Sequence, residues 1–507
     1  MRTLTLLFLV IFPFTPSLLA QITFEKKIPH NNLYTEKANS VVQLADGGFA
    51  IAGVQHIWFY VSNGVYVKTD SLGNVEDKVY YGTMNPNPVA ETFCNSILKL
   101  PDENLLMAGT TWDYGLTDFQ AFLMKVTPQG DTLWRKYYGG NKRDLFNDVA
   151  LCSDGGYIAV GASNSWNQTN YMDVYIVKTD SNGDTLWTKH WGHPDPLNIE
   201  NAFAVIESYD GGYLITGSAE GNIHPQEDLF IQKISATGDS LWLKFYEFYP
   251  PQPPNASGSR GYDLIEHNTN IFVVGYAAHP QIGLFLLLLK VEDNGNQLGF
   301  KTFMPEHVEF FATGLCKINN TFYLVANGAY EFNYNNNTEY SGSVRIIAFN
   351  EDLDSLWRRD YNMNPFPNSA SLGNSISACS DGGLIVAGYT FKENEPTYIY
   401  LIKTDSMGCV SPGCHLLSVS ENTDMDNSNF HLYPNPAHSY ITIQTDIVGY
   451  NHIEFILYDT MGRPVITEQS AANNSNVDVS KISSGIYFYT ISLNNSFVQS
   501  GKLVIAK

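Results

Sequence analysis

The chain has 507 residues, of which 44% are hydrophobic, 13% are aromatic and only 16% are charged, with a formal net charge of -22. That length fits one large repeat domain and one small module. A protein with this net negative charge is repelled by the phosphates of nucleic acid and by anionic lipid, so we expect neither as a partner.

The first residues have the pattern of a secretory signal peptide. Arg2 precedes an apolar run over residues 4–14, and Leu18-Leu19-Ala20 offers a cleavage site before Gln21. The apolar run is too short to span a bilayer, so we expect no integral membrane segment after residues 1–20 are removed.

Two short phrases recur through residues 21–416. One is an Asp-Gly-Gly turn before an apolar run, as in Asp154-Gly-Gly-Tyr-Ile-Ala-Val-Gly161. The other is an acidic turn before a Leu-Trp pair, as in Asp180-Ser-Asn-Gly-Asp-Thr-Leu-Trp187. Seven complete or degenerate copies recur about every 56 residues, which is a spacing typical of repeat architectures.

Each repeat predicts four short strands, which we call A to D. Apolar runs of strand length are bounded by Gly and Asp turns, and no helical periodicity is sustained in this region. Seven repeats of four strands predict an all-β fold, a seven-bladed β-propeller. An open β-solenoid is the alternative, although its rungs are usually shorter than this period.

The ends of the repeat array predict how the ring closes. Residues 21–30 read as a D strand that precedes the first A strand, whereas the last repeat has no Leu-Trp strand after Gly408. We therefore expect the N-terminal strand to complete the last blade and to remove both open sheet edges.

Repeated positions are interpreted as scaffold. Trp134, Trp187, Trp242 and Trp357 stand at one place in four repeats, which predicts packing between blades. Asp180-Ser-Asn-Gly-Asp184 resembles the start of a calcium loop, but Trp191 stands where the last acidic ligand would be needed, so a hairpin turn is favoured.

The six cysteines fall into two groups. Cys94, Cys152, Cys316 and Cys379 lie in A strands of different repeats and are expected to be small core residues. Cys409 and Cys414 flank Val-Ser-Pro-Gly at the end of the repeats, and in an exported protein they predict a local disulfide. We expect no metal site and no cofactor.

The two faces of the predicted propeller differ. The A–B and C–D turns are near copies, whereas the B–C and D–A connections vary, so a ligand is expected on the variable face. Exposed aromatic residues on that face favour contact with a sugar or a peptide. The candidate ligand-binding residues are Trp58, Tyr60, Trp112, Tyr114, Trp166, Trp191 and His193.

The sequence contains no motif typical of a catalytic site. It lacks His-Glu-x-x-His, Gly-x-Ser-x-Gly and a phosphate-binding glycine-rich loop, so we predict no catalytic residues. Carboxylates on the variable face could pair as the acid and base of a glycosidase, which keeps a polysaccharide hydrolase or lyase as an alternative. A structural or adhesive protein without a discrete ligand is a third reading.

The last part of the chain departs from the repeats. Residues 417–429 are polar and acidic and are interpreted as a linker. Residues 430–507 hold short alternating strands between turn clusters, which predicts a small Ig-like β-sandwich.

Four ordered motifs in this part carry a resemblance: Tyr433-Pro-Asn-Pro436, Tyr458-Asp-Thr-Met-Gly-Arg-Pro-Val465, Ser484-Gly-Ile-Tyr-Phe488 and the terminal Lys502-Leu-Val-Ile-Ala-Lys507. They resemble the type A C-terminal sorting domain of the type IX (Por) secretion system. Matching positions in the first three motifs are Tyr433, Pro434, Asn435, Pro436, Gly462, Gly485 and Tyr487.

The resemblance implies a route and a partner. A Bacteroidetes-type Gram-negative cell would carry the chain through the periplasm, and the type IX machinery would recognise this domain and move the chain across the outer membrane. The protein would then be secreted or held at the outer cell surface. The repeats also resemble those of other secreted propellers, but that resemblance implies no activity. The reading we favour is a non-catalytic propeller that binds a glycan or a protein.

Overall fold

The computed structural model describes residues 21–30, 34–58, 61–82, 90–112, 118–166, 171–192, 198–220, 227–248, 258–279, 283–303, 311–334, 337–363, 369–411, 430–445, 452–459, 464–470, 474–493 and 496–506. All regular elements in these ranges are β-strands. The chain divides into two compact units, Met1–Val410 and Ser411–Lys507.

In the described residues of the first unit, antiparallel pairing arranges the strands in seven groups of four. The first two groups are β2 (Thr35–Gln43), β3 (Phe49–Trp58), β4 (Val61–Thr69), β5 (Val75–Tyr81) and β6 (Ala90–Lys99), β7 (Leu105–Trp112), β8 (Gln120–Val126), β9 (Thr132–Tyr138). The next two are β10 (Asp144–Leu151), β11 (Tyr157–Ser163), β12 (Asp173–Thr179), β13 (Thr185–Trp191) and β14 (Glu200–Glu207), β15 (Tyr213–Glu220), β16 (Glu227–Ile234), β17 (Ser240–Tyr246).

Two further groups have the same sequential order. The seventh group contains three consecutive strands and one strand from the start of the chain. The two further groups are β18 (Ser259–His267), β19 (Asn270–His279), β20 (Gly283–Glu292), β21 (Gln297–Phe303) and β22 (Phe311–Ile318), β23 (Thr321–Tyr334), β24 (Asn337–Phe349), β25 (Ser355–Tyr361). The last is β26 (Ser369–Ala378), β27 (Leu384–Lys392), β28 (Tyr398–Thr404) and β1 (Phe24–Lys27).

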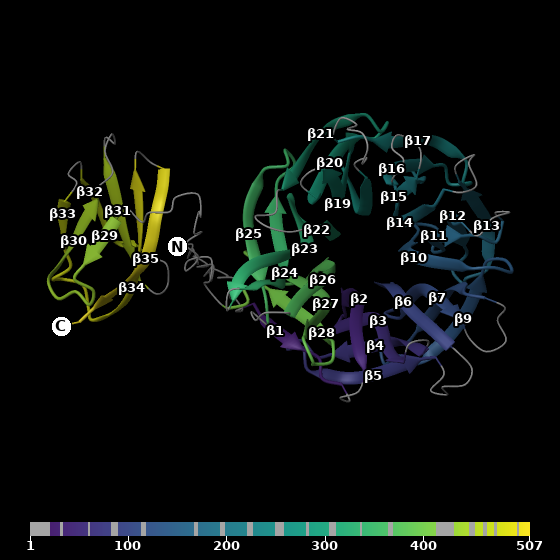
Figure 1. Cartoon of the computed structure of the whole chain (residues 1–507), viewed down its shortest axis with the longest axis horizontal. Helices are drawn as coiled ribbons and strands as arrows, with labels where there is room; N and C mark the ends of the chain where they lie inside the picture. Colours follow the sequence, from purple (N-terminus) through teal and green to yellow (C-terminus); the bar gives the residue numbers. More distant parts are fainter. Residues whose placement is uncertain are drawn as a thin grey trace, which may run out of the picture. The chain divides into compact units, whose positions relative to one another are not determined.

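The groups follow one another around a ring, with the first strand of each toward the centre (Figure 1). Each first strand contacts the first strand of the next group, from β2 through β6, β10, β14, β18, β22 and β26 and back to β2. Between groups, β4 with β6 and β24 with β26 form short parallel pairings. The first unit is thus an all-β, propeller-like arrangement of four-stranded sheets.

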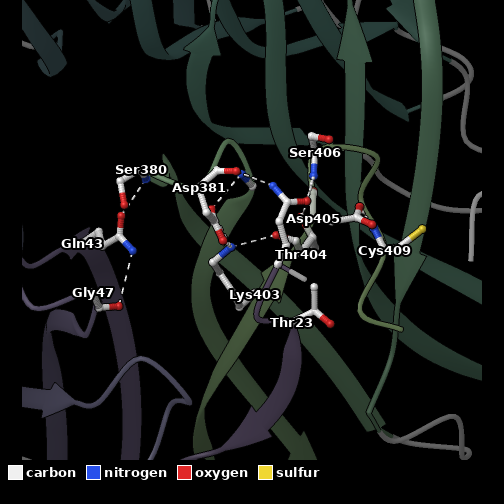
Figure 2. Close-up of polar contacts among 12 residues, drawn as sticks. Thr23, Gln43, Gly47, Ser380, Asp381, Lys403, Thr404, Asp405, Ser406 and Cys409 are labelled. Atoms are coloured by element: carbon white, nitrogen blue, oxygen red, sulfur yellow. Dashed lines mark hydrogen bonds and ion pairs between the residues drawn. The ribbon is translucent and has the colours of Figure 1, made fainter. Parts of the chain in front are cut away.

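The N-terminal strand pairs with the strand that was expected. β1 pairs antiparallel with β28, with Phe24 opposite Lys403 and Lys27 opposite Tyr400. Figure 2 shows a second connection between the ends of the ring, where the Gln43 side chain lies between Gly47 and Ser380. Gln43 Oε1 accepts a hydrogen bond from the Ser380 amide at 2.7 Å.

The Asp-Gly-Gly turns are fixed by their own side chains. Asp154 Oδ1 accepts the Gly156 amide at 2.8 Å, and Gly155 has a φ of 82°, which disfavours a side chain at that position. The Lys178 ammonium, on a side chain that is 2% exposed, lies 2.8 Å from Asp154 Oδ2. The same ion pair joins Lys233 to Asp210 and Lys403 to Asp381 at 2.8 Å, so these repeated residues are structural.

Contacts between neighbouring groups explain the repeated Leu-Trp strand. A β-carbon built on Gly183 would lie 2.8 Å from Trp134 Cη2, which shows how closely that indole covers the next C–D turn. Four residues after Trp134, the Tyr138 hydroxyl donates to the Gly183 carbonyl at 2.7 Å. Trp187, Trp242 and Trp357 cover Gly238, Gly295 and Gly408 in the same way. The predicted packing role of these tryptophans is confirmed.

The inner strands share one irregularity that the sequence analysis did not anticipate. In each first strand the pairing with the second strand shifts by one residue, which is a β-bulge. The bulged residues are Asn39, Asn95, Asn147, Phe203, Tyr262, Thr313 and Asn374. They form one level of the inner ring.

The second unit contains two sheets, in the order β29-β30-β33 and β32-β31-β34-β35. The strands are β29 (Phe430–Tyr433), β30 (Tyr440–Thr445), β31 (Ile453–Tyr458), β32 (Pro464–Ser470), β33 (Asn474–Asp478), β34 (Gly485–Leu493) and β35 (Ser496–Ile505). Buried Ile441 and Val477 from one sheet share a core with Phe455, Ile491 and Leu503 from the other.

The cysteines behave as the sequence suggests where the structure describes them. Cys94, Cys152, Cys316 and Cys379 are free thiols, and Cys316 is the one of the four that is not fully buried. Cys409 is disulfide-bonded. Cys414, its predicted partner, lies outside the described residues, so that pairing stays a prediction.

Candidate ligand-binding site

The aromatic residues predicted to bind a ligand are only partly within the described residues. Tyr60, Tyr114 and His193 lie outside them, and so does the side chain of Trp58, the last residue of β3. Trp112, Trp166 and Trp191 can be placed.

Trp112 and Trp166 contact aromatic neighbours within their own groups. The Trp112 ring lies 5.5 Å from that of Phe119. Trp166 is 43% exposed. Its ring stacks on the exposed His190 at 5.1 Å and is tilted against the buried Tyr175 at 5.0 Å. Since these two tryptophans belong to different groups, none of the described contacts brings them together.

Trp191 has a different setting from the one expected. It is the last residue of β13 rather than part of a D–A loop, because the D strand continues four residues beyond Trp187. Trp191 therefore occupies the position of Tyr138 in the preceding group. Its ring meets Phe230 edge-on at 5.0 Å, and its Nε1 donates to Gln232 Oε1 at 2.7 Å. The indole thus joins two neighbouring groups.

The bulged residues on the inner strands are mostly uncharged hydrogen-bonding side chains. The Asn95 Nδ2 donates to the Phe146 carbonyl on the next inner strand at 2.8 Å. Asn39, Asn147 and Asn374 make the equivalent bond, and Thr313 makes it through its hydroxyl. Phe203 and Tyr262 replace this pattern with a contact between their rings, whose centres are 5.2 Å apart.

Phe203 and Tyr262 are part of a larger group, which we call the Arg260 cluster. Its members come from three successive groups and from the strand ends that meet the B–C and D–A connections. They are Phe203 on β14, Glu227 on β16, Arg260 and Tyr262 on β18, Tyr276 on β19 and Phe311 on β22. All six side chains are half-buried, so the cluster reaches the surface near the centre of the ring.

The Arg260 guanidinium is held by one carboxylate and three rings. Its Nε donates to Glu227 Oε2 at 2.9 Å, and its Nη2 donates to both Glu227 oxygens. The guanidinium carbon lies 4.9, 5.6 and 5.8 Å from the ring centres of Phe203, Tyr262 and Tyr276. This combination of a bidentate ion pair and cation–π contacts fixes the orientation of the planar group.

Protonation in the cluster follows from these contacts. Burial acts to lower the pKa of Arg260, but the hydrogen bonds with Glu227 outweigh it and raise that pKa. Burial, supported by the Glu227 charge, also raises the pKa of the Tyr276 phenol, which donates to Glu227 Oε2 at 3.1 Å. Near neutral pH the Tyr276 phenol therefore stays protonated beside the Arg260–Glu227 ion pair.

The sequence does contain a signal for this cluster. When the seven repeats are compared position by position, four have Asn and one has Thr at the bulge, whereas Phe203 and Tyr262 depart from that pattern. Only the strand register shows that this column lies on one level of the inner ring.

Two carboxylates lie on the inner strands beside the bulges. Asp148 accepts from Ser96 Oγ at 2.9 Å and from the Val205 amide at 3.0 Å. Asp263 accepts from the Leu264 and Leu315 amides at 2.8 and 2.7 Å. Burial, and then the charge of Asp148, raises the pKa of Asp263 to about 7. Every oxygen of the pair has a donor, and both residues join neighbouring inner strands.

The opposite end of the inner strands contains a cavity of about 570 Å³. It is lined by the ends of β2, β22 and β26 and by Lys99, whose ammonium lies 2.9 Å from Glu103 Oε2. A second cavity of about 530 Å³ on this face is lined by turns of two groups, including the Lys125–Asp102 ion pair. Their charged groups are already paired, and their walls are built from repeated turns.

Three of the sorting-domain residues, Asn435, Gly485 and Tyr487, lie beside the last residues of β35. Asn435 Oδ1 accepts a hydrogen bond from the Val504 amide of β35 at 2.9 Å. The Ala437 amide donates a hydrogen bond to the Val504 carbonyl at 2.8 Å. Tyr433 donates to Gln444 Oε1 at 3.0 Å, and Gly485 begins β34 opposite Ile505. Tyr487 donates to the Ser483 carbonyl at 3.0 Å, whereas Gly462 lies outside the described residues.

Comparison with known families identifies this second unit. Residues 431–506 match the family described as secretion system C-terminal sorting domain. The chain is therefore directed by the type IX secretion system to the cell surface or the extracellular space, as its motifs predict. A helix that could cross a membrane is not found in the part of the chain that the structure describes.

The search of curated proteins found no match to the chain. Solved propeller-like structures are similar at low identity. A Dyadobacter fermentans protein of unknown function has 12% identity and a TM-score of 0.41, covering 75% of this chain and 97% of its own. The Pseudomonas aeruginosa periplasmic gluconolactonase PpgL has 13% identity and a TM-score of 0.40, and the match covers 74% of this chain and 98% of that one. Drosophila Semaphorin 2a has 8% identity and a TM-score of 0.46, and the match covers 96% of this chain and 98% of that one. These likenesses carry no argument about activity.

Proposed function

We propose that residues 21–416 form a closed seven-bladed β-propeller in which each four-strand group is one blade. Residues 1–20 are its signal peptide, residues 417–429 are a linker, and residues 430–507 form an Ig-like sandwich that the secretion machinery recognises. The pairing of β1 with β28 and the continuous chain of contacts between inner strands support the closed ring.

The propeller is a non-catalytic binding protein that captures a glycan or protein ligand at the outer cell surface or outside the cell. The Arg260 cluster carries this proposal. It joins half-buried aromatic rings to a fixed ion pair on the face where the connections differ between repeats. Aromatic side chains of this kind supply contact area with little loss of conformational entropy. Trp112 and Trp166 on the same face serve as outlying contacts.

Binding is favoured over hydrolysis because the inner carboxylates already have structural partners. A glycosidase needs one carboxyl group to protonate the leaving group and a second to act as nucleophile or base. In Asp148 and Asp263 all four oxygens accept hydrogen bonds, three of them from backbone amides of the inner strands. Neither residue can approach a substrate without breaking a contact between groups.

The experiment is a screen of the full-length secreted chain against glycan and cell-surface protein arrays. Three proteins are compared: the wild type, the double variant Phe203→Ala/Tyr262→Ala, and the control Tyr209→Ala. Tyr209 is 74% exposed on an Asp-Gly-Gly turn of the opposite face. We expect a ligand whose signal is lost in the double variant and kept in the control. Ligands that bind all three proteins equally would contradict the proposed site.

A further inference from the structure

We propose that the Arg260 cluster binds an uncharged glycan, with one sugar ring stacked on Tyr262 and Phe203 and its hydroxyl groups bonded to the Arg260–Glu227 pair. This inference rests on the proposed function and narrows its ligand to one chemical class.

The rings provide the apolar part of the site. Tyr262 is the centre of an aromatic patch, because its ring lies 5.2 Å from Phe203, 6.2 Å from Tyr276 and 6.2 Å from Phe311. A pyranose presents a face of C–H groups of similar size, and such a face packs on the rings of aromatic side chains. The half-buried positions of these residues leave part of the patch open to a ligand.

The polar part of the site suits hydroxyl groups. Arg260 has no charge to offer to an anion, since Glu227 binds it through both carboxylate oxygens. The pair instead offers fixed N–H donors and carboxylate acceptors side by side, which is what neighbouring sugar hydroxyls require. The Tyr262 hydroxyl, which accepts from Arg260 Nη1 at 3.3 Å, extends the same surface.

The surroundings disfavour an acidic sugar. Asn and Thr side chains fill the other bulge positions of the inner ring, and they are uncharged. The chain as a whole has a formal net charge of -22. Among the six residues of the cluster, a uronate or sulfate group would find the one cation, Arg260, already paired with Glu227.

A peptide is the main competitor for this surface. Short peptides commonly bind by adding a strand to a free sheet edge, through main-chain hydrogen bonds. The cluster lies mainly on β14, β18 and β22, which are the first strands of their groups. Side chains of the preceding inner strand already bond the backbone along the edges of β14 and β22: Asn147 donates to the Ala202 carbonyl, Asp148 accepts the Val205 amide, and Asp263 accepts the Leu315 amide. The surface therefore offers ring faces and a polar pair rather than a backbone edge.

The test measures binding of the full-length secreted chain to two sets of oligosaccharides by calorimetry. The neutral set contains β-glucan, xylan and mannan fragments, and the anionic set contains alginate, polygalacturonate and chondroitin sulfate fragments. We expect at least one neutral fragment to bind at least about tenfold more tightly than any anionic one. Tyr262→Ala and Phe203→Ala should each weaken it about tenfold, which is the size expected for the loss of one aromatic contact.

Matched variants separate recognition from folding. Tyr262→Phe keeps the ring and should keep most of the affinity, and Tyr209→Ala should change nothing. Melting temperatures are recorded for every variant, and if Tyr262→Ala does not fold, Phe203→Leu and Tyr276→Phe take its place. Glu227→Gln leaves the Arg260 charge uncompensated, so it should weaken the neutral ligand and raise affinity for the anionic set.

Three results would overturn the inference. Preference for anionic fragments would show that the charge argument is wrong. Neutral binding that survives both ring deletions would place the glycan elsewhere on the protein. Absence of all glycan binding, together with a protein ligand that is lost in Phe203→Ala/Tyr262→Ala, would exclude the glycan and leave the proposed binding function standing.

Discussion

Phe24 of β1 lies against Gly73 in the first C–D turn, so closely that a β-carbon built on Gly73 would come within 2.6 Å of Phe24 Cζ. Trp134 covers Gly183 with the same geometry. Two residues farther on, Lys26 donates to Asn74 Oδ1 at 2.7 Å, as Lys136 does to Asp184 Oδ1 at 2.6 Å. The N-terminal strand therefore repeats contacts that β9 makes with the next C–D turn, although nearly the whole first unit separates it from β28.

This contact predicts that Gly73 tolerates a side chain poorly. Gly155 is the matched control, because its φ of 82° is close to the 76° of Gly73 but nothing lies within 4 Å of an added β-carbon. Gly155→Ala should cost about 1 kcal/mol for the left-handed backbone alone. Gly73→Ala should cost a further ~1–3 kcal/mol because Phe24 must move. Urea unfolding measures both, and equal losses would mean that the contact with β1 adds no stability.

The two kinds of ion pair predict different responses to mutation. Asp154→Ala leaves the Lys178 ammonium buried without its carboxylate and should cost about 3 kcal/mol or more. Asp184→Ala removes a partner of Lys136, a pair whose side chains are 32% and 71% exposed, and should cost under about 1 kcal/mol. Chemical denaturation of the two variants provides the comparison, and similar losses would contradict a structural role for the buried lysine.

Much of the fold follows from the sequence because its signals are local. Asp-Gly-Gly and the acidic turns specify hairpins through their own side chains, and Trp134 and its repeats mark the contact between groups. The surplus strand at the N-terminus predicted the pairing of β1 with β28. These features repeat, so seven imperfect copies reinforce one another.

The site was harder to foresee because it depends on register. Trp191 seemed to belong to a loop, yet its spacing from Trp187 equals that of Tyr138 from Trp134, and both residues join neighbouring groups. Phe203 and Tyr262 are unremarkable in a strand until the bulges place them on one level of the inner ring. Glu227 and Arg260 are 33 residues apart, and their contact depends on two groups lying side by side.

The raised pKa of Asp263 predicts a pH dependence of stability. Its folded value of about 7 lies above the value of about 3.9 for an unfolded chain, so folding favours the protonated form. The contribution of Asp263 to the free energy of unfolding is therefore fully present below about pH 4, and it is lost as the pH rises through about 7. Relative to Asp263→Asn, the wild type should lose up to about 1.4 kcal/mol per pH unit in this window. Urea unfolding at pH 5 and pH 8 tests this, and a pH-independent difference would contradict it.

The sorting domain predicts a separation between export and stability. Deletion of residues 430–507 should leave the chain in the periplasm, because the type IX machinery no longer recognises it. The main urea transition of the truncated protein should match that of the full chain, since the two compact units have separate cores. A large loss of stability on truncation would show that the units share a core.

The most direct test of the account is hydrogen–deuterium exchange of the full-length chain with and without its ligand from the array screen. Binding at the Arg260 cluster predicts slower exchange in the first residues of β14, β16 and β18 and the last residues of β19. The Asp-Gly-Gly turns around Gly155 and Gly211 should exchange at the same rate in both states. Protection of those turns, with unchanged exchange at β14 and β18, would contradict the proposal that this protein binds its ligand through the variable face.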